Sequence, residues 1–467
     1  MRVDGNVDIG LGHLIRCKSL AGMLDPVFNI RFVSAGMPAA VAQDLQDRGY
    51  QVRIIDREDE FPSMVKPGDI VVLDGYDFGL PLQETIRAKG GKLVIIDDIP
   101  TGMYTADVII NHSPNVKSTD YQVVNADCVF ALGFDYALLR PAFIEQACKT
   151  RRYNVIDSLL ICFGGADKLN LTARAVSESA KFEAFKKIHV VTGPAYEYTE
   201  SLRAFMACDK RFYHYVDVTD EQMRDLMLDT ELAIVPTSGL LFEAIACKAR
   251  IIYGMYSENQ KLLYNLVTDA RHGVDAARFS SNDLRRALER SFTHSFSGDR
   301  LSIDGQSPRR MLQLFRSLLI TLRPAVWEDA EILFKWANDP DVRNNAIYRE
   351  PIALQEHLEW FKRKLGAEST RIYIMEYAGV PVGQVRYDRE GEGWLIDYSV
   401  AGEHRGKGFG TKLIQQSLAG FKTEKIIAKV LHSNAASARV FQSTGFLATG
   451  TEKIAGSEYD IFSLQNH

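Results

Sequence analysis

The first part of the chain alternates short apolar runs with amphipathic segments, and this alternation limits the fold more than any other sequence feature. The apolar runs occur in the order FNIRFVS, YQVRIID, DIVVLDG, KLVIIDD and DVIINH. Between them lie segments such as MPAAVAQDLQDRG and PLQETIRAKGG, which have helical patterns. Buried strands that alternate with amphipathic helices predict a parallel α/β sheet.

The same alternation restarts after about residue 150, with DSLLICFGG, KIHVVTG, RFYHYV, ELAIVP and ARIIYG. We therefore expect two successive α/β halves with a cleft between them. Ligands of such sheets bind at the carboxyl ends of the strands. Four conspicuous groups lie at expected strand ends: Asp74-Gly75-Tyr76, Asp97-Asp98, Gly164-Gly165 and Pro236-Thr237-Ser238-Gly239.

The chain changes character near residues 296–320. All six cysteines precede residue 250, whereas all four tryptophans follow residue 320. The later part begins with ITLRPAVWEDAEILFKWAND, a strand followed by a helix, and continues with the expected hairpin RIYIMEYAGVPVGQVRYD. A length of 467 residues suggests about three domains.

Composition narrows the class of protein. A net charge of −5 and a pI near 6.1 argue against a nucleic-acid partner. No apolar run approaches the ~18 residues that span a bilayer, and MRVDGNVD lacks the apolar region of a secretory signal. The cysteines form no CxxC pair, which is typical of reduced thiols. We expect a cytoplasmic protein with no metal and no membrane partner.

The stretch DIGLGHLIRC, residues 8–17, places His13 in a Gly-x-Gly turn that leads into a helix. Backbone N–H groups of such a turn can approach a phosphate. His13 is a titratable group that would face a cleft lined by the turn. Taken alone, the stretch favours a loop histidine that caps a helix, and the rest of the chain is needed to change that interpretation.

The run HRGKGFGTKL contains Arg405 to Gly410 as R-G-K-G-F-G, at the expected end of a strand and start of a helix. Successive N–H groups there can wrap a pyrophosphate. NAASARVFQSTGF follows, with Asn434 and Ser437 ahead of Gly445-Phe446. The ordered pair of motifs resembles the GNAT acetyltransferase superfamily over residues 320–465.

This resemblance implies an α+β GNAT domain that binds acetyl-CoA, with the pantetheine arm along WLIDYSV. The implied cofactor-binding residues are Val400, Arg405, Gly406, Lys407, Gly408, Gly410, Thr411, Asn434 and Ser437. The family's proton donor is often a tyrosine just before the Gly-Phe pair, where this chain has Phe441. Tyr398 is the candidate donor here, and Asp397 and Glu376 are candidate bases.

Within this part, FKWANDPDVRNN and LQEHLEWF resemble one branch of the superfamily. That branch is the N-acetyltransferase of pseudaminic acid biosynthesis, which acetylates the 4-amino group of a UDP-linked 4-amino-4,6-dideoxy sugar. The resemblance implies substrate contacts by Trp336 and Asn338. Relatives usually have Trp-Arg-Asn where this chain has Ala337 in the middle, and core packing of Trp336 is the competing interpretation.

Six ordered motifs of the first part resemble the UDP-sugar hydrolase of the same pathway. They are RVDGN…IGLGHLIRC, VVLDGYDFG, LVIIDD, LGFDYALLRPAF, FGGADKLNLT and SGLLFEAIACK…ENQ. The resemblance implies two Rossmann-like domains in the GT-B arrangement of glycosyltransferases, with water as the acceptor. We expect domains at residues 1–148, 149–318 and 319–467.

The hydrolase resemblance also implies individual roles. His13 would be the general base for the attacking water. Glu243 would hold the ribose, and backbone N–H groups near Gly165 and Gly239 would stabilise the departing UDP. The implied substrate-binding residues are Gly12, Asp74, Tyr76, Gly164, Gly165, Ser238, Gly239, Glu243, Asn259 and Gln260.

Together the two resemblances predict a bifunctional enzyme that acetylates a UDP-linked amino sugar and then hydrolyses the product to UDP and free sugar. Three alternatives stay open. The first half is a glycosyltransferase, or the GNAT half acts on another amine, or one half is a scaffold that binds UDP or CoA without catalysis. The oligomeric state is not predicted.

Overall fold

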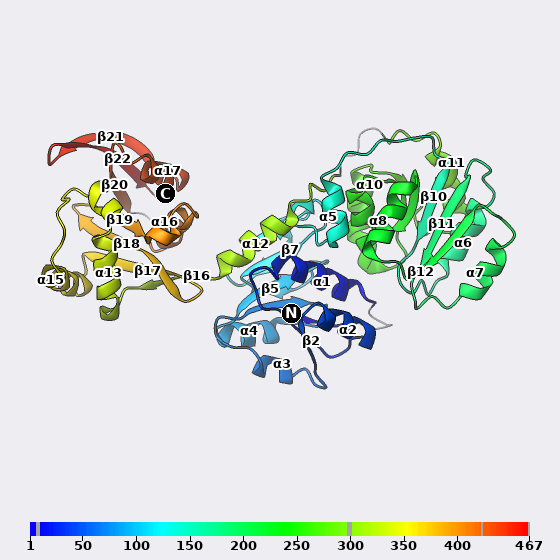
Figure 1. Ribbon diagram of the computed structural model, residues 1–467, viewed down its shortest axis with the longest axis horizontal. Coiled ribbons are helices and arrows are strands. Elements are labelled where there is room, and N and C mark those ends of the chain that lie inside the picture. The colour runs from blue at the N-terminus through cyan, green and yellow to red at the C-terminus, as the bar shows by residue number, and fades with distance from the viewer. Residues whose placement is uncertain (6–9, 297–300, 422–423, 466–467) are drawn as a thin grey trace. The chain divides into compact units, whose positions relative to one another are not determined.

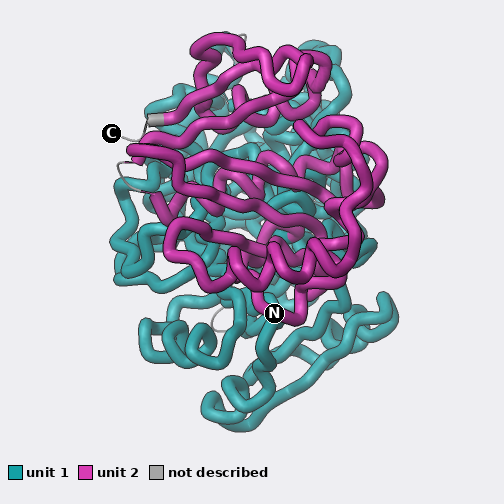
Figure 2. Tube along the Cα trace, turned by 90° about the vertical axis from the view of Figure 1, so that its left-hand side faces the viewer, with its two compact units in different colours: residues 1–315 teal, residues 316–467 magenta. Residues whose placement is uncertain are grey.

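The computed structural model describes residues 1–5, 10–296, 301–421 and 424–465. The chain divides into two compact units, Met1–Phe315 and Arg316–His467 (Figure 2). Asp8 and Ile9 of the first glycine motif lie outside the described residues, as do residues 297–300 in the expected boundary stretch. The division between the units falls within that stretch.

The first sheet of unit 1 has seven strands in the order β3-β2-β1-β4-β5-β7-β9, all paired in parallel (Figure 1). The strands are β1 (Arg2–Val3), β2 (Arg31–Ser34), β3 (Gln51–Ile54), β4 (Ile70–Asp74), β5 (Lys92–Ile96), β7 (Val108–Asn111) and β9 (Val129–Leu132). The connecting helices are α1 (Gly12–Leu24), α2 (Ala39–Asp47), α3 (Glu60–Ser63) and α4 (Leu80–Ala88). Short elements follow: β6 (Met103–Tyr104), η1 (Ser118–Asp120), β8 (Gln122–Val123) and η2 (Phe134–Tyr136). The strand order reverses between β1 and β4, which defines the switch point where such sheets bind ligands.

The second sheet has six parallel strands in the order β12-β11-β10-β13-β14-β15. They are β10 (Ser158–Cys162), β11 (Lys187–Thr192), β12 (Phe212–Val216), β13 (Leu232–Pro236), β14 (Arg250–Gly254) and β15 (Val274–Asp275). The helices are α6 (Leu171–Ser179), α7 (Thr199–Met206), α8 (Asp220–Asp229), α9 (Gly239–Ala246), η3 (Glu258–Gln260), α10 (Lys261–Asp269) and α11 (Ser281–Ser291). Its switch point lies between β10 and β13.

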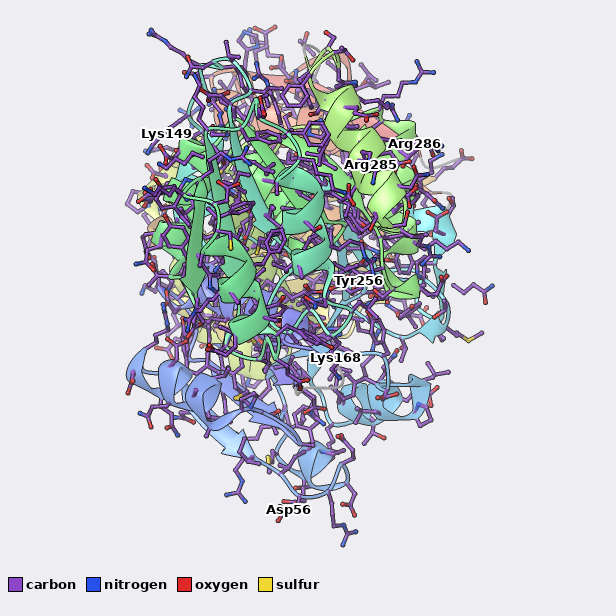
Figure 3. The ribbon with its side chains drawn as sticks, turned by 90° about the vertical axis from the view of Figure 1, so that its right-hand side faces the viewer. Asp56, Lys149, Lys168, Tyr256, Arg285 and Arg286 are labelled. Atoms are coloured by element: carbon purple, nitrogen blue, oxygen red, sulfur yellow. The ribbon has the colours of Figure 1, made fainter. Side chains whose placement is uncertain are left out.

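Both faces of this second sheet are buried. Leu159 and Ile161 belong to one apolar cluster, whereas Leu160 and Cys162 belong to another, as the alternation of side chains along a strand requires. On the outer side, α11 packs against α6, where Arg285 donates to Glu178 (3.2 Å). Figure 3 shows Arg285 on the exposed side of α11. The continuous apolar strands predicted from the sequence follow from this two-sided burial.

Two helices cross between the halves of unit 1. Helix α5 (Pro141–Ala147) follows the first sheet in the chain but packs against α8 and α9 of the second. Helix α12 (Ser307–Leu318) returns, and its Phe315 packs edge-to-face on Phe28 (6.1 Å between ring centroids). The domain boundaries at 148 and 318 stay predictions, because the structure resolves unit 1 as one compact body.

Unit 2 contains a seven-stranded sheet in the order β16-β17-β18-β19-β20-β22-β21. The strands are β16 (Ile320–Pro324), β17 (Thr370–Tyr377), β18 (Val380–Glu390), β19 (Gly393–Val400), β20 (Lys425–Leu431), β21 (Leu447–Ile454) and β22 (Ser457–Gln465). The helices are η4 (Trp327–Asp329), α13 (Ala330–Ala337), α14 (Pro340–Asn345), α15 (Leu354–Leu365), η5 (Gly402–His404), α16 (Phe409–Leu418) and α17 (Ala435–Ser443). Neighbouring strands are antiparallel except β19 and β20, which are parallel. The predicted hairpin is β17–β18.

Across the described parts of both units, no helix combines the length and the apolar character needed to cross a bilayer. The α/β class predicted for the chain is confirmed.

Candidate active sites

The first candidate site lies at the switch point of the first sheet. His13 is the second residue of α1, Asp74 ends β4, and Asp98 follows β5 by two residues. Because these strands are parallel neighbours, their carboxyl ends meet at one edge, and α1 begins beside that edge. The topology brings together residues that are far apart in the chain.

His13 and Asp74 form a close pair. His13 Nδ1 lies 2.6 Å from Asp74 Oδ1, and Asp74 is fully buried. A carboxylate only accepts hydrogen bonds, so the contact with Asp74 favours the tautomer that carries a proton on Nδ1, although Arg16 Nη2 also lies 3.0 Å from Nδ1. Asp74, which the sequence predicts to bind substrate, therefore lies against Nδ1 of His13 and orients the imidazole ring.

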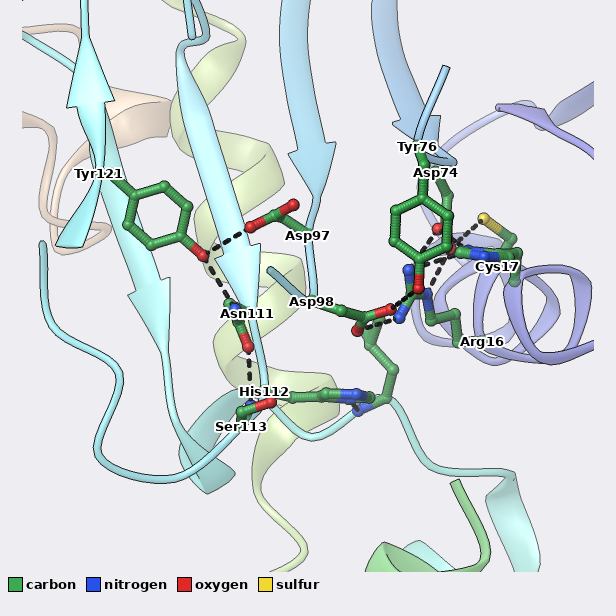
Figure 4. A network of polar contacts seen from close by, with 12 residues as sticks. Arg16, Cys17, Asp74, Tyr76, Asp97, Asp98, Asn111, His112, Ser113 and Tyr121 are labelled. Atoms are coloured by element: carbon green, nitrogen blue, oxygen red, sulfur yellow. Dashed lines mark hydrogen bonds and ion pairs between the residues drawn. The ribbon is translucent and has the colours of Figure 1, made fainter. Parts of the chain in front are cut away.

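Arg16 lies one turn after His13 on α1 and binds both carboxylates of the site (Figure 4). Its Nε donates to Asp74 Oδ2 at 2.6 Å, and its Nη1 donates to Asp98. Burial alone would raise the pKa of Asp74, but the charge of Arg16 brings it below its ordinary value. The pKa of Asp98 falls to about 2 because Arg16 outweighs burial there as well. Both carboxylates are therefore ionised at neutral pH.

Tyr76 closes the site on the solvent side. Its hydroxyl donates to Asp98 (3.2 Å), and its ring meets the His13 ring edge-to-face at 5.1 Å. Burial and the nearby Asp98 raise the pKa of Tyr76 to about 12, although a side-chain hydrogen bond to Asn259 lowers it. Asn259 belongs to η3 of the second half, so two predicted substrate-binding residues from different halves come together.

A carboxylate bonded to one nitrogen of an imidazole is an arrangement that suits a general base. The carboxylate fixes the tautomer and stabilises the imidazolium that forms when Nε2 takes a proton. Arg16 was not singled out in the sequence, although its spacing of three residues from His13 places both on one helix face.

The second switch point presents backbone N–H groups. Gly164 follows β10 with φ of +94°, a conformation that favours glycine. Gly193 approaches so closely that a Cβ there would lie 2.3 Å from the Gly165 carbonyl oxygen. Ser238 precedes α9, which begins at Gly239, and no side chain caps this helix. Uncapped N–H groups at a helix start attract anions.

Side chains near α9 are engaged with protein partners. Arg140 donates to both carboxylate oxygens of Glu243, at 2.6 and 2.7 Å, and also to Asp220 (2.6 Å). Burial raises the pKa of Glu243, although Arg140 opposes the rise. Gln260 accepts a hydrogen bond from the Tyr256 N–H (2.9 Å). The roles expected of Glu243 toward ribose and of Gln260 toward the sugar or phosphate stay predictions.

The third candidate site is a gap between β19 and β20 in unit 2. These strands pair from Gly393↔Lys425 to Ile396↔Ala428, and the pairing stops there, so residues 397–400 of β19 have no partner residue on β20. Helix α16 begins next to the end of β19, at Phe409. Gly408 precedes it with φ of +82°, and no side chain caps the helix. Backbone N–H groups at such an uncapped helix start attract anions.

Charged and polar side chains bind the segment between β19 and α16 and the start of α17. Arg405 donates to Asp339 (2.7 Å), Asp341 (2.6 Å) and the Val400 carbonyl (3.0 Å). Asn434 caps α17 by accepting from the Ser437 N–H (3.1 Å). Gly406 and Lys407 are exposed, and the Thr411 hydroxyl lies 3.4 Å from that of Ser443. Direct cofactor contacts by these side chains stay predictions.

Tyr398 lies on β19 beside the start of α16. Its hydroxyl donates to Ser437 Oγ (3.2 Å), and a Cβ added at Gly410 would lie 3.1 Å from its ring. Burial raises the pKa of Tyr398, so the phenol carries its proton at neutral pH. Phe441 is 3% exposed and packs against Phe446 (5.0 Å), within the core.

The other predicted residues of unit 2 have structural partners. Trp336 is 6% exposed and belongs to an apolar cluster, and the Asn338 side chain bonds the backbone of Ile352 in both directions. Glu376 pairs with Arg323 (2.7 Å). The substrate contacts expected of Trp336 and Asn338 stay predictions.

Among the residues that the structure describes, no group of three or more histidine, cysteine, aspartate or glutamate side chains is arranged to hold a metal ion. Fold and sites together define the class: a two-unit α/β protein with a His–Asp pair at a switch point of unit 1 and, in unit 2, a gap between two strands near an uncapped helix start.

Comparisons with known proteins identify a family model and several proteins that are similar to this chain. Residues 320–447 match the model of the acetyltransferase (GNAT) domain. Over 266 residues, 56% of this chain and 92% of the relative, the chain is 25% identical to the UDP-2,4-diacetamido-2,4,6-trideoxy-beta-L-altropyranose hydrolase of Campylobacter jejuni. It is also 25% identical to an uncharacterised protein of Methanocaldococcus jannaschii over 96% of both chains. The crystal structure of spermidine N-acetyltransferase from Vibrio cholerae with CoA and spermine covers 32% of this chain and 96% of its own, at 20% identity and a TM-score of 0.29.

The chain therefore joins a hydrolase-like segment to a C-terminal GNAT acetyltransferase domain, as the sequence motifs predicted. The similarity to the archaeal protein over nearly all of both chains indicates that the two segments occur together there as well.

Proposed function

We propose that the chain is a bifunctional enzyme of pseudaminic acid biosynthesis. Its GNAT domain transfers an acetyl group from acetyl-CoA to the 4-amino group of a UDP-linked 4-amino-4,6-dideoxy sugar. Its first unit hydrolyses the product, UDP-2,4-diacetamido-2,4,6-trideoxy-L-altrose, to UDP and the free sugar. The observation that carries the proposal is the His13–Asp74 pair at the switch point of a chain similar to the hydrolase.

In the hydrolysis, His13 Nε2 removes a proton from a water molecule as its oxygen bonds to the anomeric carbon. The bond between that carbon and the UDP oxygen breaks, and water enters opposite to it, so the configuration inverts. Asp74 stabilises the imidazolium. UDP leaves with its negative charge near the N–H groups around Gly165 and at the start of α9. We infer a GT-B arrangement of the two sheets from the same similarity, with α5 and α12 as its crossing helices.

In the acetyl transfer, the sugar amine attacks the thioester carbon of acetyl-CoA, and the C–S bond breaks. The amine nitrogen passes its proton to a base, for which Asp397 and Glu376 are the candidates, and the departing thiolate takes a proton from Tyr398, whose phenolate then regains one from water. The gap between β19 and β20 supports a pantetheine site, and the uncapped start of α16 supports a pyrophosphate site. Backbone N–H groups would supply the phosphate contacts, since Arg405 is bound by Asp339 and Asp341.

The test supplies the purified chain with the UDP-linked 4-amino sugar, with and without acetyl-CoA, and measures UDP by anion exchange. We expect UDP only when acetyl-CoA is present. His13→Ala abolishes UDP release while CoA release continues, and His432→Ala, a change at an exposed histidine of unit 2, preserves both. Consumption of acetyl-CoA without UDP release by the unmutated chain contradicts the hydrolase assignment. UDP release that needs a second sugar as acceptor would indicate a glycosyltransferase.

A further inference from the structure

We propose that His112 donates a hydrogen bond from its Nε2 to the β-phosphate of the nucleotide sugar and of the departing UDP. This contact rests on the proposed hydrolysis and adds a residue that none of the motifs identifies. It is a substrate contact made by a neutral side chain, separate from the proton transfer by His13.

The position of His112 supports this role. It follows directly after β7, which pairs with β5, and β5 in turn pairs with β4; Asp98 follows β5 by two residues, and Asp74 ends β4. The three strands are parallel, so these residues share one edge of the sheet. Figure 4 shows the His112 ring extending from its strand toward the side of the network that holds Arg16.

One hydrogen bond fixes which nitrogen of His112 carries the proton. The Leu138 N–H donates to Nδ1 at 3.3 Å, so the proton of the neutral ring is on Nε2. Burial and the charge of Arg16 lower the pKa of His112 to about 4, so the ring is neutral at physiological pH. Within the described residues, Nε2 has no protein hydrogen-bond partner. His112 is therefore a fixed donor with an unused N–H.

A ring contact joins His112 to the first turn of α9, the proposed site of the diphosphate. The imidazole ring lies 4.2 Å from the Phe242 ring, with 32° between the planes. Phe242 is in the first turn of α9, which begins at Gly239. His112 thus contacts α9, whose start would hold the diphosphate, and shares the edge of the sheet with Asp74, which binds His13. A neutral N–H there stabilises the charge on the leaving group by a hydrogen bond and does not itself give up its proton.

The test compares the affinities of UDP and UMP for the full chain by calorimetry. We expect His112→Phe, which keeps a ring against Phe242, to weaken UDP binding about tenfold to a hundredfold, the size of a hydrogen bond to a charged group. UMP lacks the β-phosphate, so its affinity stays unchanged. His112→Gln carries an amide N–H near the Nε2 position and keeps UDP affinity within about threefold.

His189→Phe is the matched control, because His189 is a buried histidine of β11 that contacts Tyr215 and lies outside the site. Unchanged UDP affinity in His112→Phe overturns the proposal, and so does an equal loss for UDP and UMP, which indicates a structural role. Should His112→Phe not fold, ¹⁵N-histidine spectra of the unmutated chain decide the matter: UDP, but not UMP, shifts the His112 Nε2 signal. If the unmutated chain binds neither nucleotide, the proposed function fails and the contact fails with it.

Discussion

At the scale of single residues, Arg16 sets the charge of the first site. One guanidinium neutralises part of the charge of the buried Asp74 and the half-buried Asp98, and so keeps both carboxylates ionised. The proposed role of His13 as general base requires an ionised Asp74, because a protonated carboxyl could not stabilise an imidazolium.

Asp74→Asn tests this dependence. We expect UDP release from the diacetamido nucleotide sugar to slow at least about a hundredfold, because the neutral amide neither fixes the tautomer nor stabilises the imidazolium. Initial rates of UDP release measure the change.

The control is Asp56→Asn, at an exposed position outside the network (Figure 3). It leaves the rate unchanged. Equal rates for Asp74→Asn and the unmutated chain would show that the pair does not act in the reaction.

The ionisation of Asp97 makes the stability of unit 1 depend on pH. Burial raises its pKa to about 6, and the Tyr121 hydroxyl donates to it at 3.1 Å. Since the folded chain holds this proton more tightly than the unfolded chain does, stability is highest below pH ~4 and falls as the pH rises through ~6. Asp97→Asn keeps an acceptor for Tyr121 but never ionises.

We therefore expect Asp97→Asn to be more stable than the unmutated chain at pH ~7.5, by up to about 3 kcal/mol, and nearly equal to it at pH ~4. Urea unfolding of the full chain at both pH values measures the difference. A constant difference across this range would contradict ionisation of Asp97 as its cause.

At the scale of elements, the start of α16 depends on a backbone conformation. Gly408 has φ of +82°, where a β-branched residue is strained, and a relaxed backbone would change the direction of the first N–H groups of α16, the proposed pyrophosphate site. Gly408→Val is expected to raise the KM for acetyl-CoA at least about tenfold. CoA release at varied acetyl-CoA concentration measures it.

Gly456 supplies the matched control, because it has nearly the same φ, +84°, in the turn between β21 and β22. Gly456→Val carries the same strain in unit 2 but leaves the KM unchanged. A similar rise in both variants would mean that general destabilisation, and not the helix start, causes the effect.

At the scale of the whole molecule, the two proposed reactions run in series. The groups proposed for hydrolysis all lie in unit 1, and those proposed for acetyl transfer all lie in unit 2. Tyr398→Phe is expected to slow CoA release at least about tenfold, because the thiolate loses its proton donor. UDP release from the 4-amino sugar falls with it. Supplying the acetylated nucleotide sugar restores UDP release to the unmutated rate.

Tyr377→Phe, at a tyrosine of β17 with no assigned role, is the control and preserves both rates. A failure of the acetylated sugar to restore UDP release would show that the hydrolysis needs more than unit 1 and its own substrate.

The sequence by itself determined the local features of this protein. Apolar alternation marked the parallel strands, and glycine spacing marked the loops at Gly164 and Gly408, because strand burial and positive φ leave signatures within a few residues. His13 was recognisable for the same reason, from its glycine turn.

Only the tertiary structure decided which side chains meet. Asp74 is 61 residues from His13, Glu243 is 103 from Arg140, and Asp339 is 66 from Arg405. Such pairs leave no local pattern, since strand order and helix crossings bring them together. The same carboxylate can bind a substrate or orient a base, and the choice depends on the neighbours that the fold supplies.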